Sequence, residues 1–340
     1  MTQPRLTSTH KRVLGSAGAV IVVAVAFALL LPKIANYRSV LDVIGTLSLP
    51  WLIALVAVAI LNVATFGPPW MAALPGLSYR QSMVLTQTST ALSSAVPGGD
   101  AVGIGVSYGM LRGWRFDTQA VTAAVVVTGL WNQLINVAIP ITAVGLLALE
   151  GSDDRRLRVL SLIAAGILAA VIIGLVLVLR SEEQARRVGR RTGRLLTSLA
   201  RPLRRGPYTS LDESFARFRN ETVALLAHRW WVITLAQLAG HLTVFLVLLV
   251  SLRAVGVDAS QVSLVEALAA WSLIRLLTAI PITPGGLGIV EVGLSAALVG
   301  FGGPNDACVA AVLLYRALTF VPPVLLGMLL GLTWRRHANA

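Results

Sequence analysis

Long runs of apolar residues limit what this chain can fold into more than any other feature of its sequence. Six runs extend over about 20 residues or more, the length that an α-helix needs to cross the hydrocarbon core of a bilayer. Inside lipid the backbone must hydrogen-bond to itself, so runs of this length indicate helices. We therefore predict an all-α polytopic membrane protein, with full transmembrane spans near residues 13–31, 50–74, 118–148, 157–180, 230–254 and 307–333.

The composition agrees with a membrane protein and argues against a large soluble domain. Hydrophobic residues make up 56% of the 340 residues and charged residues only 13%, compared with about 25% charged residues in soluble domains. The longest polar segment, residues 180–229, is too short and too basic to form a substantial core. The single cysteine, Cys308, excludes an intrachain disulfide and a cysteine-based zinc site.

Two further apolar stretches, residues 82–111 and 262–302, are each interrupted by the sequence Pro-Gly-Gly. Proline removes a backbone donor and glycine resists the helical conformation, so we expect a helix to break at each interruption. Each stretch is either a crossing helix with a kink or a re-entrant hairpin that turns back at the break. The breaks lie at Pro97, Gly98 and Gly99 and at Pro284, Gly285 and Gly286.

The distribution of arginine favours the hairpins. Arg80 precedes the first broken stretch, and Arg112 and Arg115 follow it, so a hairpin keeps all three on one side of the membrane. If the N-terminus is cytoplasmic, two hairpins also place the arginine-rich loop 180–229 in the cytoplasm, as the positive-inside rule requires. Kinked crossings would instead add two spans and move this loop outside.

These assignments predict a single transmembrane domain over residues 13–334 in the plasma membrane, with both termini cytoplasmic. Basic cytoplasmic loops that face anionic headgroups explain the net charge of +13, so nucleic acid is not expected as a partner. The predicted parts are the N-terminal segment 1–12, the first half 13–180, the basic loop 181–229, the second half 230–334 and the tail 335–340.

With two hairpins, the chain contains two copies of one unit in opposite orientations. Each copy is a span, a hairpin and a span, and the hairpins open to opposite sides of the membrane. The Pro-Gly-Gly sequence that starts at Pro97 recurs at Pro284. Inverted repeats with broken helices are typical of secondary transporters. The alternative is that Pro-Gly-Gly recurs by chance in a chain with 30 glycines.

A cluster of ionisable groups near the second break points most directly to function. Arg275 precedes the break, Glu291 follows it, and Tyr315 and Arg316 lie inside the last predicted span. Ionisable groups within membrane segments indicate functional sites, and a broken helix offers N–H groups and its dipole to an anion. We expect Arg275 and Arg316 to hold a lipid phosphate, with Glu291 orienting an arginine or contacting a cationic headgroup. The alternative is an ion pair between Arg275 and Glu291 that only fixes the hairpin.

At the first break, Asp100 follows Pro-Gly-Gly directly. Its carboxylate is either a further headgroup ligand or a cap on the helix that starts there. The chain contains no GxxxxGK[ST], HExxH, GxSxG or CxxC pattern. We therefore predict no catalytic residue, no metal site and no cofactor.

Three segments resemble a known family. TPGGLGIVEVGLSAAL at residues 283–298 and LLYRALTFVPPVLLG at 313–327 are similar to the signature of the lysylphosphatidylglycerol synthase transmembrane region, or flippase-like domain family. VPGGDAVGIGVSYGMLRGWRFDTQA at 96–120 is similar to an earlier motif of that family. The resemblance covers roughly residues 15–335 and implies a domain with re-entrant segments that moves lipids between leaflets. The functional positions that it implies are Pro97, Gly98, Pro284, Gly285, Gly286, Gly288, Glu291 and Arg316.

In the full-length aminoacyl-lipid synthases, a soluble aminoacyl-transfer domain follows the membrane region, and no such domain follows within these 340 residues. We therefore expect a lipid translocase rather than an enzyme, acting on a phospholipid or a polyprenyl-phosphate-linked lipid. One alternative is a membrane enzyme that acts on a lipid-linked substrate. Another is a non-catalytic partner of a lipid-modifying enzyme. Membrane lipids are the expected binding partners in each case.

Overall fold

The computed structural model describes residues 45–94, 99–150, 165–166, 168–170, 172–174, 211–278 and 283–334. All regular secondary structure in these residues is helical, which confirms the predicted all-α class. The predicted span 13–31 lies outside the described residues, as does 157–180 apart from a few helical residues. The other four predicted spans are confirmed as helices long and apolar enough to cross a membrane, namely Leu49–Ala73, Thr118–Leu149, Thr222–Ala254 and Asn305–Thr333.

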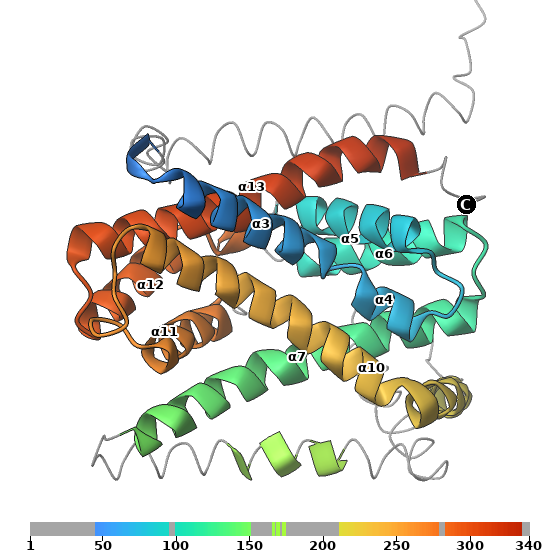
Figure 1. Cartoon of the computed structure of the whole chain (residues 1–340). Helices are drawn as coiled ribbons and strands as arrows, with labels where there is room; N and C mark the ends of the chain where they lie inside the picture. The colour runs from blue at the N-terminus through green and yellow to red at the C-terminus, as the bar shows by residue number, and fades with distance from the viewer. Residues whose placement is uncertain are drawn as a thin grey trace, which may run out of the picture. The chain divides into compact units, whose positions relative to one another are not determined.

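The described helices fall into two compact units, and each unit is described by itself (Figure 1). The first unit takes its residues from Met1–Gly67, Leu77–Trp114 and Ala239–Ala340, and the second from Pro68–Gly76 and Arg115–Leu238. In chain order the elements are α3 (Leu49–Ala64), α4 (Pro68–Ala73), α5 (Tyr79–Ser94), α6 (Asp100–Gly113), α7 (Thr118–Leu149), α10 (Leu211–Ala254), α11 (Leu264–Leu277), the 3₁₀ turn η2 (Pro284–Gly286), α12 (Ile289–Gly300) and α13 (Asn305–Thr333).

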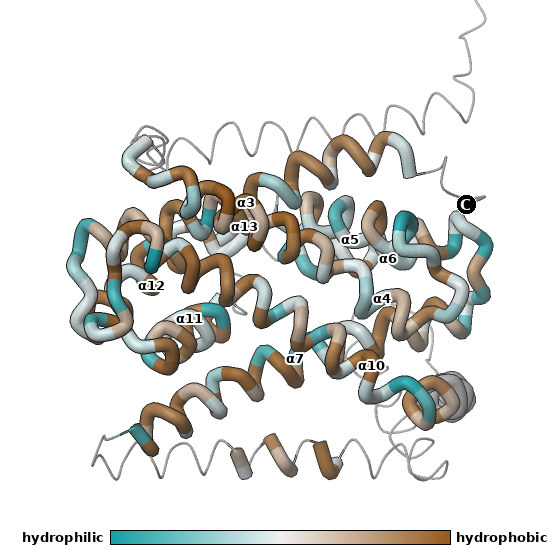
Figure 2. Tube along the Cα trace, in the orientation of Figure 1, coloured by the Kyte–Doolittle hydropathy of each residue, from teal (hydrophilic) through white to brown (hydrophobic). Residues whose placement is uncertain are grey.

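The long helices are apolar on their outer faces as well as in the core, as expected of helices that contact lipid. Figure 2 shows that α3, α7 and α13 are predominantly hydrophobic along their lengths. On α3, for example, Leu49, Ile53 and Ile60 are each more than 60% exposed. In water such a face would be unfavourable, whereas in a bilayer it lies against lipid tails.

In the second unit, α4 packs against α7, and the first part of α10 joins them. Ala72, Val127 and Ile233 form the buried centre of this packing. Polar side chains add hydrogen bonds between α7 and α10: the indole N–H of Trp131 donates to Thr234 Oγ1 at 2.9 Å. Bonds of this kind hold helices together in lipid, where the hydrophobic effect no longer favours association.

In the first unit, α5 packs against the C-terminal half of α13, and glycines make the contact close. A Cβ atom added to Gly327 would overlap the carbonyl oxygen of Gln87 and lie 2.6 Å from Ala91 Cβ. One turn later, an added Cβ at Gly331 would lie 3.1 Å from the Thr88 methyl group. Small residues let membrane helices approach in this way, because no bulky side chain keeps the backbones apart and dispersion contacts between the helices then stabilise the pair.

Two pairs of short helices, α5 with α6 and α11 with α12, approach α13 from its opposite ends (Figure 1). At the C-terminal end of α13, the indole N–H of Trp114 donates to the carbonyl oxygen of Trp334 at 3.0 Å, just after α6. At the N-terminal end, Gly303 packs against Val262 and the last turn of α12. The longest of these four helices has 16 residues, fewer than the roughly 20 needed to cross a bilayer.

The inner ends of the two pairs meet beside the middle of α13. A Cβ atom added to Gly285, in η2, would lie 2.5 Å from the Phe320 ring and 3.7 Å from the carbonyl oxygen of Ser94, the last residue of α5. The second Pro-Gly-Gly break therefore lies against the end of the helix that precedes the first break. Of the first break itself, Pro97 and Gly98 lie outside the described residues.

The close contact at Gly327 makes a stability prediction. We expect Gly327→Ala to destabilise the protein by about 1–3 kcal/mol, because the added methyl group forces α13 away from α5. The measurement is thermal unfolding of the purified protein in detergent. Gly109→Ala on α6 is the matched control, since an added Cβ there meets nothing within 4 Å and alanine favours the helix. Equal melting temperatures for the two variants would contradict the packing described.

Candidate functional site

The second break depends on glycine at three positions. Gly285, Gly286 and Gly288 have φ values of 57°, 68° and 83°, a region that residues with a Cβ atom rarely adopt. Space is limiting as well, because a Cβ atom on Gly286 would lie 2.9 Å from the Thr278 methyl group. A residue with a Cβ atom at any of these three positions would therefore strain the turn that leads into α12.

Glu291 fixes the start of the helix that follows the break. Gly288 is the N-cap residue of α12, and its backbone N–H donates to Glu291 Oε2 at 2.6 Å. This is the glutamate half of a capping box; Gly288 has no side chain to provide the other half. The carboxylate also lies in the first turn, where the helix dipole stabilises a negative charge.

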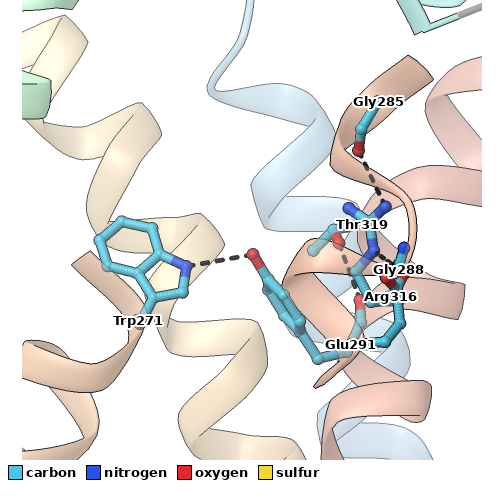
Figure 3. Close-up of polar contacts among 7 residues, drawn as sticks. Trp271, Gly285, Gly288, Glu291, Arg316 and Thr319 are labelled. Carbon is cyan, nitrogen blue, oxygen red and sulfur yellow. Dashed lines mark hydrogen bonds and ion pairs between the residues drawn. The ribbon is translucent and has the colours of Figure 1, made fainter. Parts of the chain in front are cut away.

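Arg316 joins this carboxylate from α13. Its Nε donates to Glu291 Oε1 at 2.7 Å, and its Nη2 donates to the carbonyl oxygen of Gly285 at 3.0 Å (Figure 3). The side chains of Arg316 and Glu291 are only 14% and 11% exposed. The guanidinium carbon lies 4.8 Å from the centroid of the Phe320 ring. One arginine thus connects α13 to both the turn and the helix of the second break.

Arg275 and Tyr315 belong to an adjoining cluster built around Trp271. The indole N–H of Trp271 donates to the Tyr315 hydroxyl oxygen at 3.0 Å (Figure 3). The Arg275 guanidinium carbon lies 5.4 Å from the centroid of the Trp271 ring, within the range of a cation–π interaction. Phe245, from α10, also packs against Trp271, with 5.6 Å between the two ring centroids.

The structure contradicts one of the two interpretations of Glu291. The alternative paired Glu291 with Arg275, whereas in the structure Glu291 forms its ion pair with Arg316. Arg275 instead lies in the last turn of α11, over Trp271. The other interpretation, in which Glu291 orients an arginine, matches the geometry, and Arg316 is the arginine that it orients.

The remaining predicted site residues lie at the first break or in η2. Asp100 is exposed in the first turn of α6. Gly99, the N-cap residue of that helix, is buried against the end of α5, where an added Cβ would overlap the Ser93 backbone. Pro284 begins η2. Of the predicted site residues, the hydrogen bonds described above bring together Gly285, Gly288, Glu291 and Arg316, with Tyr315 and Arg275 in the adjoining cluster.

Two aromatic residues of the site were not among the predicted residues. Trp271 lies four residues before Arg275, and Phe320 lies four residues after Arg316. Residues four apart share one face of a helix, so an arginine with an aromatic residue at this spacing in an apolar helix was an available signal. Each aromatic ring lies beside its arginine in the structure, as this spacing requires.

Part of the site offers hydrogen-bond donors to an anion. Arg316 uses two of the five N–H groups of its guanidinium in the bonds described above. The Nη1 edge and the start of α12 therefore offer donors to a further acceptor. Among the described residues, no group of three or more His, Cys, Asp or Glu side chains gathers to hold a metal ion.

Comparison with known proteins identifies one family. The model of the family described as "Lysylphosphatidylglycerol synthase TM region" matches residues 16–327, nearly the whole chain. The match includes both Pro-Gly-Gly breaks and the Glu291–Arg316 ion pair. None of the curated proteins matches the chain closely enough to count as a relative.

The ion pair predicts strong coupling between two substitutions. Arg316→Met should destabilise the protein by about 3–5 kcal/mol, because it leaves a buried carboxylate without its partner. Adding Glu291→Gln should recover at least about 1 kcal/mol, since glutamine keeps the cap and removes the charge. Unfolding in detergent of the two single variants and the double variant measures this coupling. Purely additive effects would show that the two side chains do not interact.

Proposed function

The chain belongs to the lysylphosphatidylglycerol synthase transmembrane-region family, and on that basis we propose that it moves a phosphate-bearing lipid between the two leaflets of its membrane. It is a multi-pass membrane protein with four described helices long enough to span a bilayer. The proposed cargo is a phospholipid or a polyprenyl-phosphate-linked lipid, and the proposed activity is translocation without chemical change.

The ion pair of Arg316 with Glu291 at a helix break is the observation that supports this proposal most strongly. Ionisable groups within membrane helices are costly, by about 2.5–3.5 kcal/mol each on insertion scales. A chain that needed only a stable bundle would place apolar residues there, since such replacements are often neutral or stabilising. A binding site for the polar head of a lipid would explain why an arginine, a carboxylate and the free N–H groups at a helix start occur together within a membrane protein.

Two re-entrant hairpins are part of the proposal. We assign α5 with α6 to one hairpin and α11 with α12 to the other, entering the membrane from opposite sides. Three observations support this assignment: the helices are short, the pairs approach α13 from opposite ends, and their inner ends meet beside Phe320. In the proposal, the first hairpin with spans 50–74 and 118–148 forms one copy of the inverted repeat, and the second hairpin with spans 230–254 and 307–333 forms the other. The predicted spans 13–31 and 157–180 bring the number of full spans to six.

In this arrangement the headgroup crosses and the acyl or prenyl tails stay in lipid. The phosphate would bind the open edge of Arg316 near Gly285, where the two inner ends meet. Because the hairpins open to opposite faces, a headgroup held there could be reached from either leaflet in turn, as in other transporters with inverted repeats. We place the protein in the plasma membrane with both termini in the cytoplasm, which puts the basic loop 180–229 on the cytoplasmic side.

A direct test measures lipid movement by the purified protein. Reconstituted into liposomes that contain a fluorescent phosphatidylglycerol, the protein should make inner-leaflet lipid accessible to an impermeant quencher. Arg316→Ala should reduce this rate at least tenfold, because it removes the guanidinium that holds the phosphate. Glu291→Gln should also reduce the rate, because Arg316 loses the charged partner that orients it. Arg80→Ala, an exposed arginine at the start of α5, is the control and should keep the rate.

Two results would contradict the proposed function. One is full translocation by Arg316→Ala that is folded and reconstituted as well as the parent protein. The other is a chemically altered lipid in mass spectra of the recovered liposomes, which would favour the membrane enzyme instead.

Single cysteines test the hairpins independently of transport. In a Cys308→Ser background, cysteines replace Arg80 and Arg115 at the outer ends of the first hairpin, and Ser260 and Asn305 at those of the second. These four residues are exposed. An impermeant maleimide added to intact spheroplasts should label positions 260 and 305 and leave 80 and 115 unlabelled until the cells are opened. Labelling of only one member of a pair would mean that the segment crosses the membrane.

A further inference from the structure

The two carboxylate oxygens of Glu291 have separate tasks. Oε2 accepts the backbone N–H of Gly288 and caps α12, whereas Oε1 accepts the Nε–H of Arg316. The cap does not require a charge, because glutamine also serves at this position of a capping box. The bond at Oε1 does depend on the charge, since protonation removes the negative charge that strengthens it and places an O–H against the N–H of the guanidinium. Protonation at Oε1 would therefore release Arg316 and leave the cap in place.

The net charge of the site changes when a lipid phosphate binds. With the site empty, the charges of Glu291 and Arg316 cancel, and both side chains are largely buried. A phosphodiester on the open edge of Arg316 adds a second negative charge next to the carboxylate. The two anions repel each other in a largely buried site, and one arginine cannot neutralise both. One proton on the carboxylate restores neutrality.

We infer that Glu291 takes up one proton from water when a lipid phosphate binds Arg316 and releases it when the phosphate leaves. The proton binds at Oε1, so that the neutral pair of arginine and carboxylate becomes a neutral pair of arginine and phosphate. This inference rests on the proposed function and adds a coupled ion to it. Each phosphate group carried through the site is accompanied by a proton, so a pH gradient across the membrane biases the direction of lipid movement.

The other ionisable groups on the helices packed against α12 have different contacts. On α13, the Tyr315 hydroxyl accepts the Trp271 indole N–H, and Asp306 lies in the first turn and accepts from Asn305. On α11, Arg275 lies over Trp271. Glu266 occupies the same capping position as Glu291: its Oε2 accepts the backbone N–H of Ser263 at 2.8 Å. Glu291 is the carboxylate bonded to Arg316, and Glu266 is its natural control.

The test measures binding and proton uptake together, on the full-length protein in detergent. The probe is dihexanoyl phosphatidylglycerol, titrated by calorimetry in two phosphate-free buffers of different ionisation enthalpy. We expect about one proton to be taken up for each lipid bound. Over the pH range in which only the lipid complex is protonated, the affinity should weaken about tenfold for each unit by which the pH rises. By the same linkage, lipid binding and proton binding strengthen each other equally.

Matched substitutions locate the proton. Glu291→Gln should bind the probe without proton uptake and with an affinity independent of pH, because glutamine keeps the cap and copies the neutral state. Glu266→Gln changes the same capping position on α11 and should keep the proton uptake and the pH dependence of the parent protein. In liposomes, an imposed pH gradient should change the direction of lipid movement by the parent protein and by Glu266→Gln.

Several outcomes would overturn the inference. Lipid binding without proton uptake in the parent protein would mean that the phosphate leaves Glu291 charged. An unchanged pH dependence in Glu291→Gln would assign the proton to another group. Either result, obtained with a protein that still moves lipid, removes the coupled proton and leaves the proposed function intact. A parent protein that neither binds the probe nor moves any lipid in the liposome assay removes both.

Discussion

A single carboxylate, that of Glu291, holds the second break in its observed shape. One of its oxygens ends the turn by capping α12, and the other fixes Arg316 on the neighbouring helix. Arg316 in turn bonds the carbonyl oxygen of Gly285, inside the turn. The turn, the helix after it and α13 are therefore connected through three hydrogen bonds that share two side chains. Because both side chains are largely buried, little water competes for these groups, and such bonds define position strongly.

Glycine provides the complementary constraint, by letting backbones approach where the polar groups must meet. Gly285 and Gly288 adopt a backbone conformation that other residues avoid, and Gly327 lets α5 lie against α13. Hydrogen bonds hold the turn in place, and close packing holds the helices around it. Both are needed to define the site, because the bond from Arg316 to the Gly285 carbonyl oxygen depends on how closely α13 packs.

Sequence patterns predicted the parts of this protein that depend on local chemistry. The apolar runs gave the four described spans to within a few residues at most boundaries, because length and hydropathy alone decide whether a helix crosses lipid. The second break followed from the backbone chemistry of proline and glycine. The cost of ionisable groups in a membrane singled out Glu291 and Arg316, which the structure brings together as an ion pair. The partner of Glu291 did not follow, because Arg275 and Arg316 are equally plausible by sequence and only helix packing decides between them. The aromatic residues Trp271 and Phe320 were missed since we did not consider arginine together with its neighbours one turn away.

The contact between Gly285, Phe320 and the end of α5 has a consequence for how the molecule can open. With no Cβ at Gly285, the two inner ends are packed against the same stretch of α13, without a spacer side chain between them. Closely packed elements of this kind switch between discrete arrangements rather than deform gradually. Displacing the end of α5 would therefore disturb the packing of η2, and the reverse, so the two ends are expected to move together rather than independently.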